Sequence, residues 1–157
     1  MKINWIALIA AILICNLAGI IGSVFTFSAI PNWYATLVKP ELSPPNWVFG
    51  PVWTTLYTLM GIAAYLVWEK GIKKKEVRKA LGVFGVQLVL NSVWSIIFFG
   101  MNEIFYAFIE IIFLWLAIAA SIFLFYKIDK RAAYLLIPYI LWVSFAAFLN
   151  YNLWLLN

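Results

Sequence analysis

Two tryptophans deep in apolar segments are the residues whose type and spacing best suit a binding site. Trp53 and Tyr57 are four residues apart, so both rings lie on one face of a helix. Trp142 is followed by Ala146 and Leu149 at +4 and +7, so that face is aromatic and then small. Such rings can stack on a flat partner. Their depth argues against a role as interfacial anchors at the ends of the segments.

A polar stripe runs through the segment around residue 90. Gln87, Asn91, Trp94, Ser95 and Phe98 occupy i, i+4, i+7, i+8 and i+11, which places them on one helix face. Unsatisfied amides in hydrocarbon are expensive, so this face must look at other helices or at a cavity. Hydrogen bonds between helices and contact with a ligand explain the stripe equally well, and the sequence leaves both open.

Conventional catalytic groups are scarce. The chain has no histidine, which is the commonest general base and zinc ligand and the usual axial ligand of haem iron. We find no carboxylate pair and no activated nucleophile, and we predict no metal site. Glu110 is the acidic residue inside an apolar segment, where it is either functional or a protonated hydrogen-bonding partner of a neighbouring helix. The single Cys15 permits no intramolecular disulfide.

The composition places these residues in a membrane. Hydrophobic residues occupy 66% and charged residues 11% of the 157 positions, whereas about a quarter of a soluble domain is charged. A spanning helix needs about 20 mostly apolar residues. We therefore expect an all-α integral membrane protein, a single domain over residues 1–157 built as a five-helix bundle, with spans at roughly 5–26, 47–68, 80–99, 104–126 and 132–154.

The cations predict the orientation of this bundle. Ten of the 11 Lys and Arg residues lie on one side, at Lys2 and in the loops at 70–79 and 127–131, and Lys39 alone lies on the other. Short cytoplasmic loops hold the Lys/Arg excess, which predicts a cytoplasmic N-terminus and a C-terminus outside, in a bacterial cell membrane. The positive net charge then indicates contact with anionic lipid headgroups rather than with nucleic acid.

The segment at 27–46 is too long and too aromatic for a simple connector. Four prolines stiffen it, and Trp33, Tyr34 and Trp47 are rings typical of a membrane interface. An interfacial belt would explain the rings by themselves. Their density together with the prolines favours a folded loop that covers the helix bundle.

The first span carries a stripe of small and polar residues, Asn16, Gly19, Gly22 and Ser23. Small residues let helix backbones approach closely, which is the favoured explanation, and a pocket wall is the alternative. In either case the stripe faces protein.

Three blocks of the chain resemble a known family. The first contains Trp33, Tyr34, Lys39, Pro40, Pro44, Pro45, Trp47, Phe49, Gly50, Pro51, Trp53, Tyr57, Met60 and Gly61. The second contains Gln87, Asn91, Trp94, Phe98, Phe99 and Gly100, and the third contains Pro138, Tyr139, Trp142, Phe145, Ala146, Leu149, Asn150 and Trp154. In this order and spacing they resemble the translocator protein family, also called tryptophan-rich sensory proteins.

The resemblance covers nearly the whole chain and implies a cavity between five helices, capped by the first loop, in a homodimer. Its members bind porphyrins and benzodiazepine- or isoquinoline-type ligands, so it implies a protoporphyrin-like ligand or substrate and no required cofactor. Carried over residue by residue, it implies a ligand site lined by Gly22, Tyr34, Phe49, Trp53, Tyr57, Gln87, Asn91, Trp94, Tyr106, Trp142, Ala146 and Leu149. A porphyrin suits these residues, because its flat ring stacks on Trp and Tyr and its carboxylates suit a cation such as Lys39.

One departure concerns sterols. The family's proposed cholesterol motif combines Leu or Val, then Tyr, then a basic residue. Leu149 and Tyr151 are present here, but Leu155 stands at the basic position. The sequence therefore does not predict sterol binding, and such motifs are weak indicators even when complete.

The leading hypothesis is a membrane protein that binds tetrapyrroles and promotes their light-dependent oxidative breakdown, with Trp53 and Trp142 as the chemically active residues. A transporter of porphyrin or other small hydrophobic molecules is the alternative, although common transporter folds are built from repeated halves and no internal repeat is visible here. A ligand-dependent sensor or scaffold is the third hypothesis.

Overall fold

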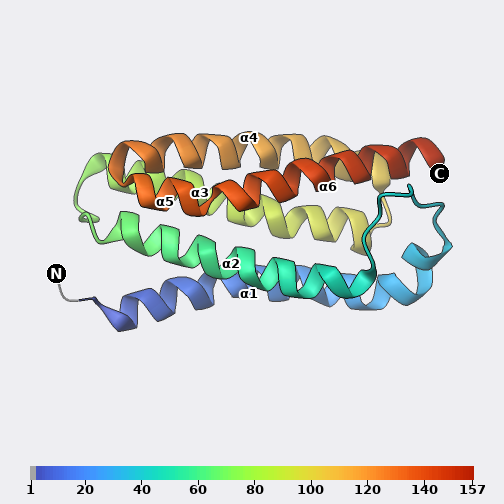
Figure 1. Cartoon of the computed structure of the whole chain (residues 1–157), viewed down its shortest axis with the longest axis horizontal. Coiled ribbons are helices and arrows are strands. Elements are labelled where there is room, and N and C mark those ends of the chain that lie inside the picture. The colour runs from blue at the N-terminus through green and yellow to red at the C-terminus, as the bar shows by residue number, and fades with distance from the viewer. Residues whose placement is uncertain (1–2) are drawn as a thin grey trace.

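A computed structural model describes residues 3–157, and every regular element in that part of the chain is helical. Figure 1 shows long helices lying side by side. Their bounds are α1 Trp5–Ala29, α2 Asn46–Trp68, α3 Lys75–Ser95, α4 Ile104–Ile128, α5 Lys130–Leu135 and α6 Ile137–Leu156. π-helical turns at Ile30–Tyr34 and Ile96–Gly100 extend α1 and α3.

In the part of the chain that the structure describes, five segments are long and apolar enough to cross a membrane: Trp5–Tyr34, Asn46–Trp68, Lys75–Gly100, Ile104–Ile128 and Lys130–Leu156. The fifth combines α5 and α6, which a single turn at Leu136 separates just before Pro138. Proline has no N–H to continue the helical hydrogen bonds, which accounts for the break. The expected all-α bundle of five apolar helices is confirmed.

The first helix continues beyond its expected end at residue 26, as far as Tyr34. Pro31 is accommodated because it lies near the start of a π-helical turn. Side chains supply local hydrogen bonds there, since Ser28 Oγ donates to the Phe25 carbonyl and Asn32 Nδ2 to the Ser28 carbonyl. The irregular part of the first loop therefore shrinks to residues 37–45.

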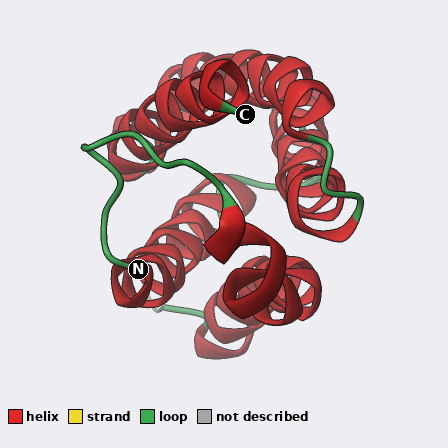
Figure 2. Cartoon of the chain, turned by 90° about the vertical axis from the view of Figure 1, so that its right-hand side faces the viewer, coloured by secondary structure: helices red, strands yellow, loops and turns green. Residues whose placement is uncertain are grey.

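The helices pack around a shared core (Figure 2). α1 lies against α2 and α3, while α4 lies against α3, α5 and α6. Gly61 of α2 sets the closest approach, because a Cβ there would overlap the backbone of Ile12 in α1. Met60, Ala63 and Val67, on the inner side of α2, are fully buried.

The two ends of the bundle differ in character (Figure 1). One end carries the start of α1 and the loop at 69–74, and we call it the basic end because Lys70 and Arg131 lie there, both paired with Asp129. The other carries residues 37–45 and the C-terminus, and we call it the loop end. At the loop end, Asn157 Nδ2 donates to the Val38 carbonyl and the Val38 N–H donates to Asn157 Oδ1, both at 2.9 Å.

Asp129 joins the two loops of the basic end. Its carboxylate lies 3.1 Å from Lys70 Nζ and 2.8 Å from Arg131 Nη2, and it accepts a hydrogen bond from the Arg131 N–H at the start of α5. Hydrogen bonds from Arg131 and the nearby Lys70 hold the pKa of this carboxyl group well below its usual range. The Lys70–Asp129 ion pair thus connects the loop after α2 to the turn after α4.

Candidate ligand-binding cavity

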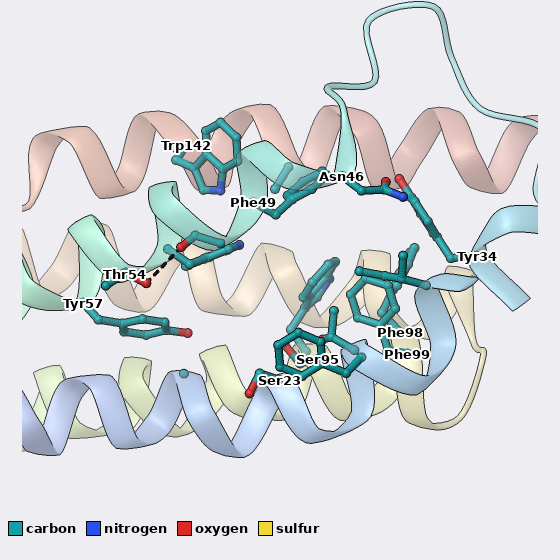
Figure 3. A pocket seen from close by; sticks show the side chains of 18 of the residues that line it. Ser23, Tyr34, Asn46, Phe49, Thr54, Tyr57, Ser95, Phe98, Phe99 and Trp142 are labelled. Atoms are coloured by element: carbon teal, nitrogen blue, oxygen red, sulfur yellow. Dashed lines mark hydrogen bonds between the residues drawn. The ribbon is translucent and has the colours of Figure 1, made fainter. Parts of the chain in front are cut away.

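A cavity of about 620 Å³ lies in the half of the bundle nearest the loop end. Side chains from α1, α2, α3, α6 and both π-helical turns surround it, as Figure 3 shows for a set of them. Its volume falls within the range of about 300–1,000 Å³ that is usual for small-molecule sites. The lining is chiefly apolar and aromatic.

Aromatic rings form the wall of the cavity on α2 and α6. Trp53 stacks on Tyr57 with ring centroids 5.6 Å apart and an interplanar angle of 28°. It also meets Tyr139 edge-on at 6.4 Å. Trp142 lies 6.1 Å from Phe49 in an edge-to-face arrangement. Both predicted active tryptophans therefore line the same cavity, each held by neighbouring rings.

A second group of rings lines the cavity toward the loop end. Trp94 stacks on Phe98 at 5.0 Å, and Tyr34 contacts Phe98 at 6.3 Å and Phe99 at 5.9 Å. Outside them, Lys39 Nζ lies 4.7 Å from the centroid of the Tyr34 ring, within the range of a cation–π contact. The cation is therefore placed beside the wall of the cavity at its loop end.

Polar side chains of the lining are mostly engaged with the protein. Asn16, Thr26 and Thr54 each donate to a carbonyl one turn earlier in their own helix, and the Thr54 bond is drawn in Figure 3. Trp94 Nε1 donates to Asn150 Oδ1 at 3.0 Å. A ligand would consequently be held mainly by ring stacking and apolar contact.

The cavity is open at its α1–α2 edge. Phe27 on α1 and Trp47 on α2 both line it, yet they are 77% and 75% exposed. Toward the basic end it is closed, because Met60, Ala63 and Val67 fill the interior there. The cavity therefore occupies one half of the bundle and does not continue through it.

Eight of the twelve predicted ligand-site residues line this cavity. They are Tyr34, Phe49, Trp53, Tyr57, Trp94, Trp142, Ala146 and Leu149. Gly22 lies beside it, where a Cβ would come within 2.9 Å of Ser95 Oγ. Tyr106 is 62% exposed on α4 and is not brought to the cavity. Contact of each of these residues with a ligand stays a prediction.

Gln87 and Asn91 lie behind the aromatic wall rather than on it. Tyr57 Oη donates to Asn91 Oδ1, Asn91 Nδ2 donates to Tyr139 Oη at 2.8 Å, and Tyr139 Oη donates to Gln87 Oε1 at 2.8 Å. Gln87 Nε2 is 3.8 Å from Met60 Sδ. This buried network joins α2, α3 and α6, and it fixes the hydroxyl of the ring on which Trp53 stacks.

Glu110 does not line the cavity, and it makes no hydrogen bond to the network. Its side chain is buried with 8% exposure, and within residues 3–157 neither carboxyl oxygen has a hydrogen-bond partner. A buried polar group without a partner costs stability. The arrangement gives the carboxyl group no role in the cavity.

Sequence reasoning had left α1 largely out of the site. The structure adds a helical face at three- and four-residue spacing, made of Asn16, Gly19, Ile20, Ser23, Thr26, Phe27 and Ile30. The small and polar stripe was the available signal, and both of its explanations hold. Gly19 packs closely on the Tyr57 ring and lines the cavity at the same time.

Five apolar helices around an aromatic cavity of ligand size define an integral membrane protein with a candidate binding site between its helices. The sequence profile described as the TspO/MBR family matches residues 11–155, and the chain belongs to that family. It is 42% identical to the tryptophan-rich protein TspO of Chlorobaculum tepidum over 92% of this chain and 91% of that protein.

Two further relatives have other names. The translocator protein of Homo sapiens is 40% identical over 96% of this chain and 89% of its own length. The tryptophan-rich sensory protein of Cereibacter sphaeroides is 32% identical over 100% of this chain and 95% of its own. Both cover all five apolar helices.

Proposed function

We propose that the cavity binds a porphyrin or related tetrapyrrole and that Trp53, with Trp142, promotes its light-dependent oxidation. The observation that carries this is the pair of indoles lining one cavity, with Trp53 stacked on a ring held by a buried network. Indole rings stack well on flat π-systems. The apolar lining suits the macrocycle, and Lys39 suits a propionate at the loop end.

The proposed chemistry uses light and dioxygen from outside the protein. The photoexcited porphyrin accepts one electron from the Trp53 indole, which gives a porphyrin radical anion and an indole radical cation. Dioxygen adds to the porphyrin radical anion, and the adduct returns one electron to the indole radical cation. The O–O bond and one C–C bond at a bridging carbon then break, which places one oxygen atom on each end of a linear tetrapyrrole. The protein contributes stacking, orientation and a cavity that separates the reaction from freely diffusing species.

The same cavity would accept benzodiazepine- or isoquinoline-type ligands, which are also flat and aromatic. A transport function is favoured less, because the cavity is closed toward the basic end by Met60, Ala63 and Val67. Flux of porphyrin into sealed vesicles that contain the protein would favour transport over binding and breakdown.

We also infer that the basic end faces the cytoplasm. Lys70, Lys73, Lys74 and Lys75 gather at that end, and Lys39 lies at the other. This distribution matches the Lys/Arg excess of cytoplasmic loops.

Absorbance titration of the purified protein with protoporphyrin tests the proposal. In the dark we expect a saturable shift of the porphyrin absorbance band at one porphyrin per chain. Under illumination in air we expect the bound porphyrin to bleach faster than porphyrin in empty detergent micelles, with new absorbance from a linear tetrapyrrole. Saturable binding without faster bleaching would support porphyrin binding and reject light-dependent oxidation. Absence of saturable binding would overturn both parts of the proposal.

A further inference from the structure

The two aromatic rings that pack against Trp53 both belong to tyrosines. Tyr57 stacks on the indole with ring centroids 5.6 Å apart, and Tyr139 meets it edge-on at 6.4 Å. A phenol that can release its proton is oxidised more easily than an indole, so a tyrosine this close is a competing electron donor. The proposed photochemistry therefore places an indole radical cation beside two side chains whose oxidation would end it.

Early loss of the radical cation at Trp53 would defeat the reaction. Dioxygen must first add to the porphyrin radical anion, and only then does the adduct return an electron to the indole. If a tyrosine reduced the indole earlier, the electron on the porphyrin would have no acceptor in the protein and would leave on dioxygen as superoxide. The porphyrin would then be regenerated unopened, and the protein would keep a tyrosyl radical.

Oxidation of a tyrosine requires a base at its hydroxyl group. A phenol that loses an electron becomes a strong acid, so its proton must pass to an acceptor such as an imidazole or a carboxylate. The chain contains no histidine. Glu110, in the interior of α4, makes no hydrogen bond to either hydroxyl group. Within residues 3–157, the hydroxyl groups of Tyr57 and Tyr139 therefore meet neither kind of base.

Amide side chains hold both hydroxyl groups instead. Tyr57 Oη donates to Asn91 Oδ1, and Tyr139 Oη donates to Gln87 Oε1 at 2.8 Å. An amide oxygen accepts a hydrogen bond, but the amide is not a titratable base. Asn91 Nδ2 also donates to Tyr139 Oη at 2.8 Å, which withdraws electron density from that ring. The network thus satisfies both hydroxyl groups and gives neither proton a destination.

Tyr65, two turns further along α2, has a different acceptor. Its hydroxyl group donates to Glu69 Oε1 at 3.1 Å, and its ring stacks on Trp68 at 6.2 Å. This pair lies toward the basic end and outside the lining of the cavity. The tyrosine with a carboxyl acceptor is therefore kept away from Trp53, and the two tyrosines beside Trp53 have amide acceptors.

We propose that Asn91 and Gln87 are positioning residues that confine the oxidised state to Trp53, because they hold the protons of the neighbouring tyrosines on acceptors that do not take them up. The proposal rests on the photo-oxidation proposed above. It adds the reason why the indole radical cation lasts until its electron returns. It also names the product that confinement avoids, which is superoxide released from an unopened porphyrin.

Position 87 allows a matched pair of variants. Gln87→His places an imidazole near the Tyr139 hydroxyl group, and an imidazole is largely a neutral base at pH 8. Gln87→Met gives a side chain of similar length without a base, so it carries any purely structural effect of losing the amide. Asn91→His is the equivalent change at Tyr57, and it gives the same readout if Gln87→His does not fold.

Electron paramagnetic resonance detects the radicals in the purified full chain with bound protoporphyrin, illuminated in air at pH 8 and then frozen. Growth on deuterated tyrosine narrows a tyrosyl signal and so assigns it. We expect no tyrosyl signal from the unmodified protein or from Gln87→Met, and a tyrosyl signal from Gln87→His. Gln87→His should also lose most of the linear tetrapyrrole formed per photon absorbed and release superoxide in its place.

A tyrosyl signal in the unmodified protein equal to that of Gln87→His would overturn the proposal. A folded Gln87→His variant with no tyrosyl signal, or with undiminished linear product, would overturn it too. If porphyrin does not bleach in the unmodified protein, the proposed function fails, and confinement is judged separately with dicyanoanthracene, a flat photo-oxidant that has no macrocycle to open. A tyrosyl signal in Gln87→His but not in Gln87→Met would then support confinement, and equal signals would overturn it.

Discussion

Residues that line the cavity and residues that hold its aromatic wall in place are distinct in this protein. Trp53 lines the cavity, and Asn91 lies one layer behind it, where it holds the hydroxyl groups of Tyr57 and Tyr139. Sequence spacing alone made Asn91 a ligand residue and an interhelical residue with equal merit. The observed network favours the second explanation and gives it a physical effect, the fixing of the ring under Trp53.

The role of Trp53 can be separated from its bulk. Phenylalanine keeps a ring, so Trp53→Phe should retain porphyrin binding to within about 1 kcal/mol. Phenylalanine is a far poorer electron donor than indole, so light-dependent bleaching at matched occupancy should nearly stop. Bleaching rates are compared by absorbance under the same illumination, with Phe49→Leu as a control that alters the lining without removing an indole. Equal rates in Trp53→Phe and the unmodified protein would show that the indole does no chemistry.

The network predicts coupling between Tyr57 and Asn91. Asn91→Leu leaves the Tyr57 hydroxyl buried without its partner, which should lower the free energy of unfolding by about 1–3 kcal/mol. Tyr57→Phe strands the Asn91 carbonyl oxygen in the same way.

The double variant Tyr57→Phe/Asn91→Leu removes both partners and should cost less than the sum of the two single changes. Thermal unfolding of the four proteins of this double-mutant cycle in one detergent measures these costs. Additive costs would mean that the two side chains do not depend on each other.

Among the elements, the five spans were predictable because length and hydrophobicity decide whether a helix crosses a membrane. The loop end was predicted less well. Pro31 suggested an irregular segment, whereas a π-helical turn accommodates it and carries α1 as far as Tyr34. The small and polar stripe was the only sign that α1 forms a wall of the cavity. Residue spacing defines a helix face but does not say which other helix that face packs against. The position of Gln87 behind the aromatic wall could not be predicted for the same reason.

The short α5 depends on Asp129, which accepts from the Arg131 N–H and pairs with Lys70. Because its pKa in the folded protein is lowered, its contribution to stability is fully present above its ordinary pKa near 3.8 and is lost as the pH falls through the lower folded value. Asp129→Asn should therefore cost about 2 kcal/mol near neutral pH.

The difference in unfolding temperature between Asp129→Asn and the unmodified protein should be constant from about pH 8 to pH 5 and should shrink below about pH 4. Glu41→Gln, which removes a carboxylate from an exposed loop residue, serves as the control. A difference that stays constant below pH 4 would rule out the ionised carboxylate as the stabilising group.

For the whole molecule, orientation in the membrane determines which surface the loop end and its cavity face. With the basic end in the cytoplasm, a cysteine introduced at Lys74 should resist a membrane-impermeant thiol reagent in intact cells, and one at Glu41 should react. Cys15 is buried and contributes no background. Permeabilised cells provide the control in which both positions react, and the reverse pattern in intact cells would invert the proposed topology.

The cavity is open at its edge between Phe27 and Trp47. This opening makes the concentration of ligand in the bilayer, rather than in water, the quantity that sets occupancy of the cavity. A hydrophobic ligand reaches that edge from the hydrocarbon phase, so occupancy follows moles of ligand per mole of lipid rather than molarity in water. At fixed total ligand and protein, doubling the lipid should roughly halve occupancy when the site is far from saturated. Two compounds with equal contacts in the cavity would then differ in apparent aqueous affinity by the ratio of their partition coefficients into the bilayer.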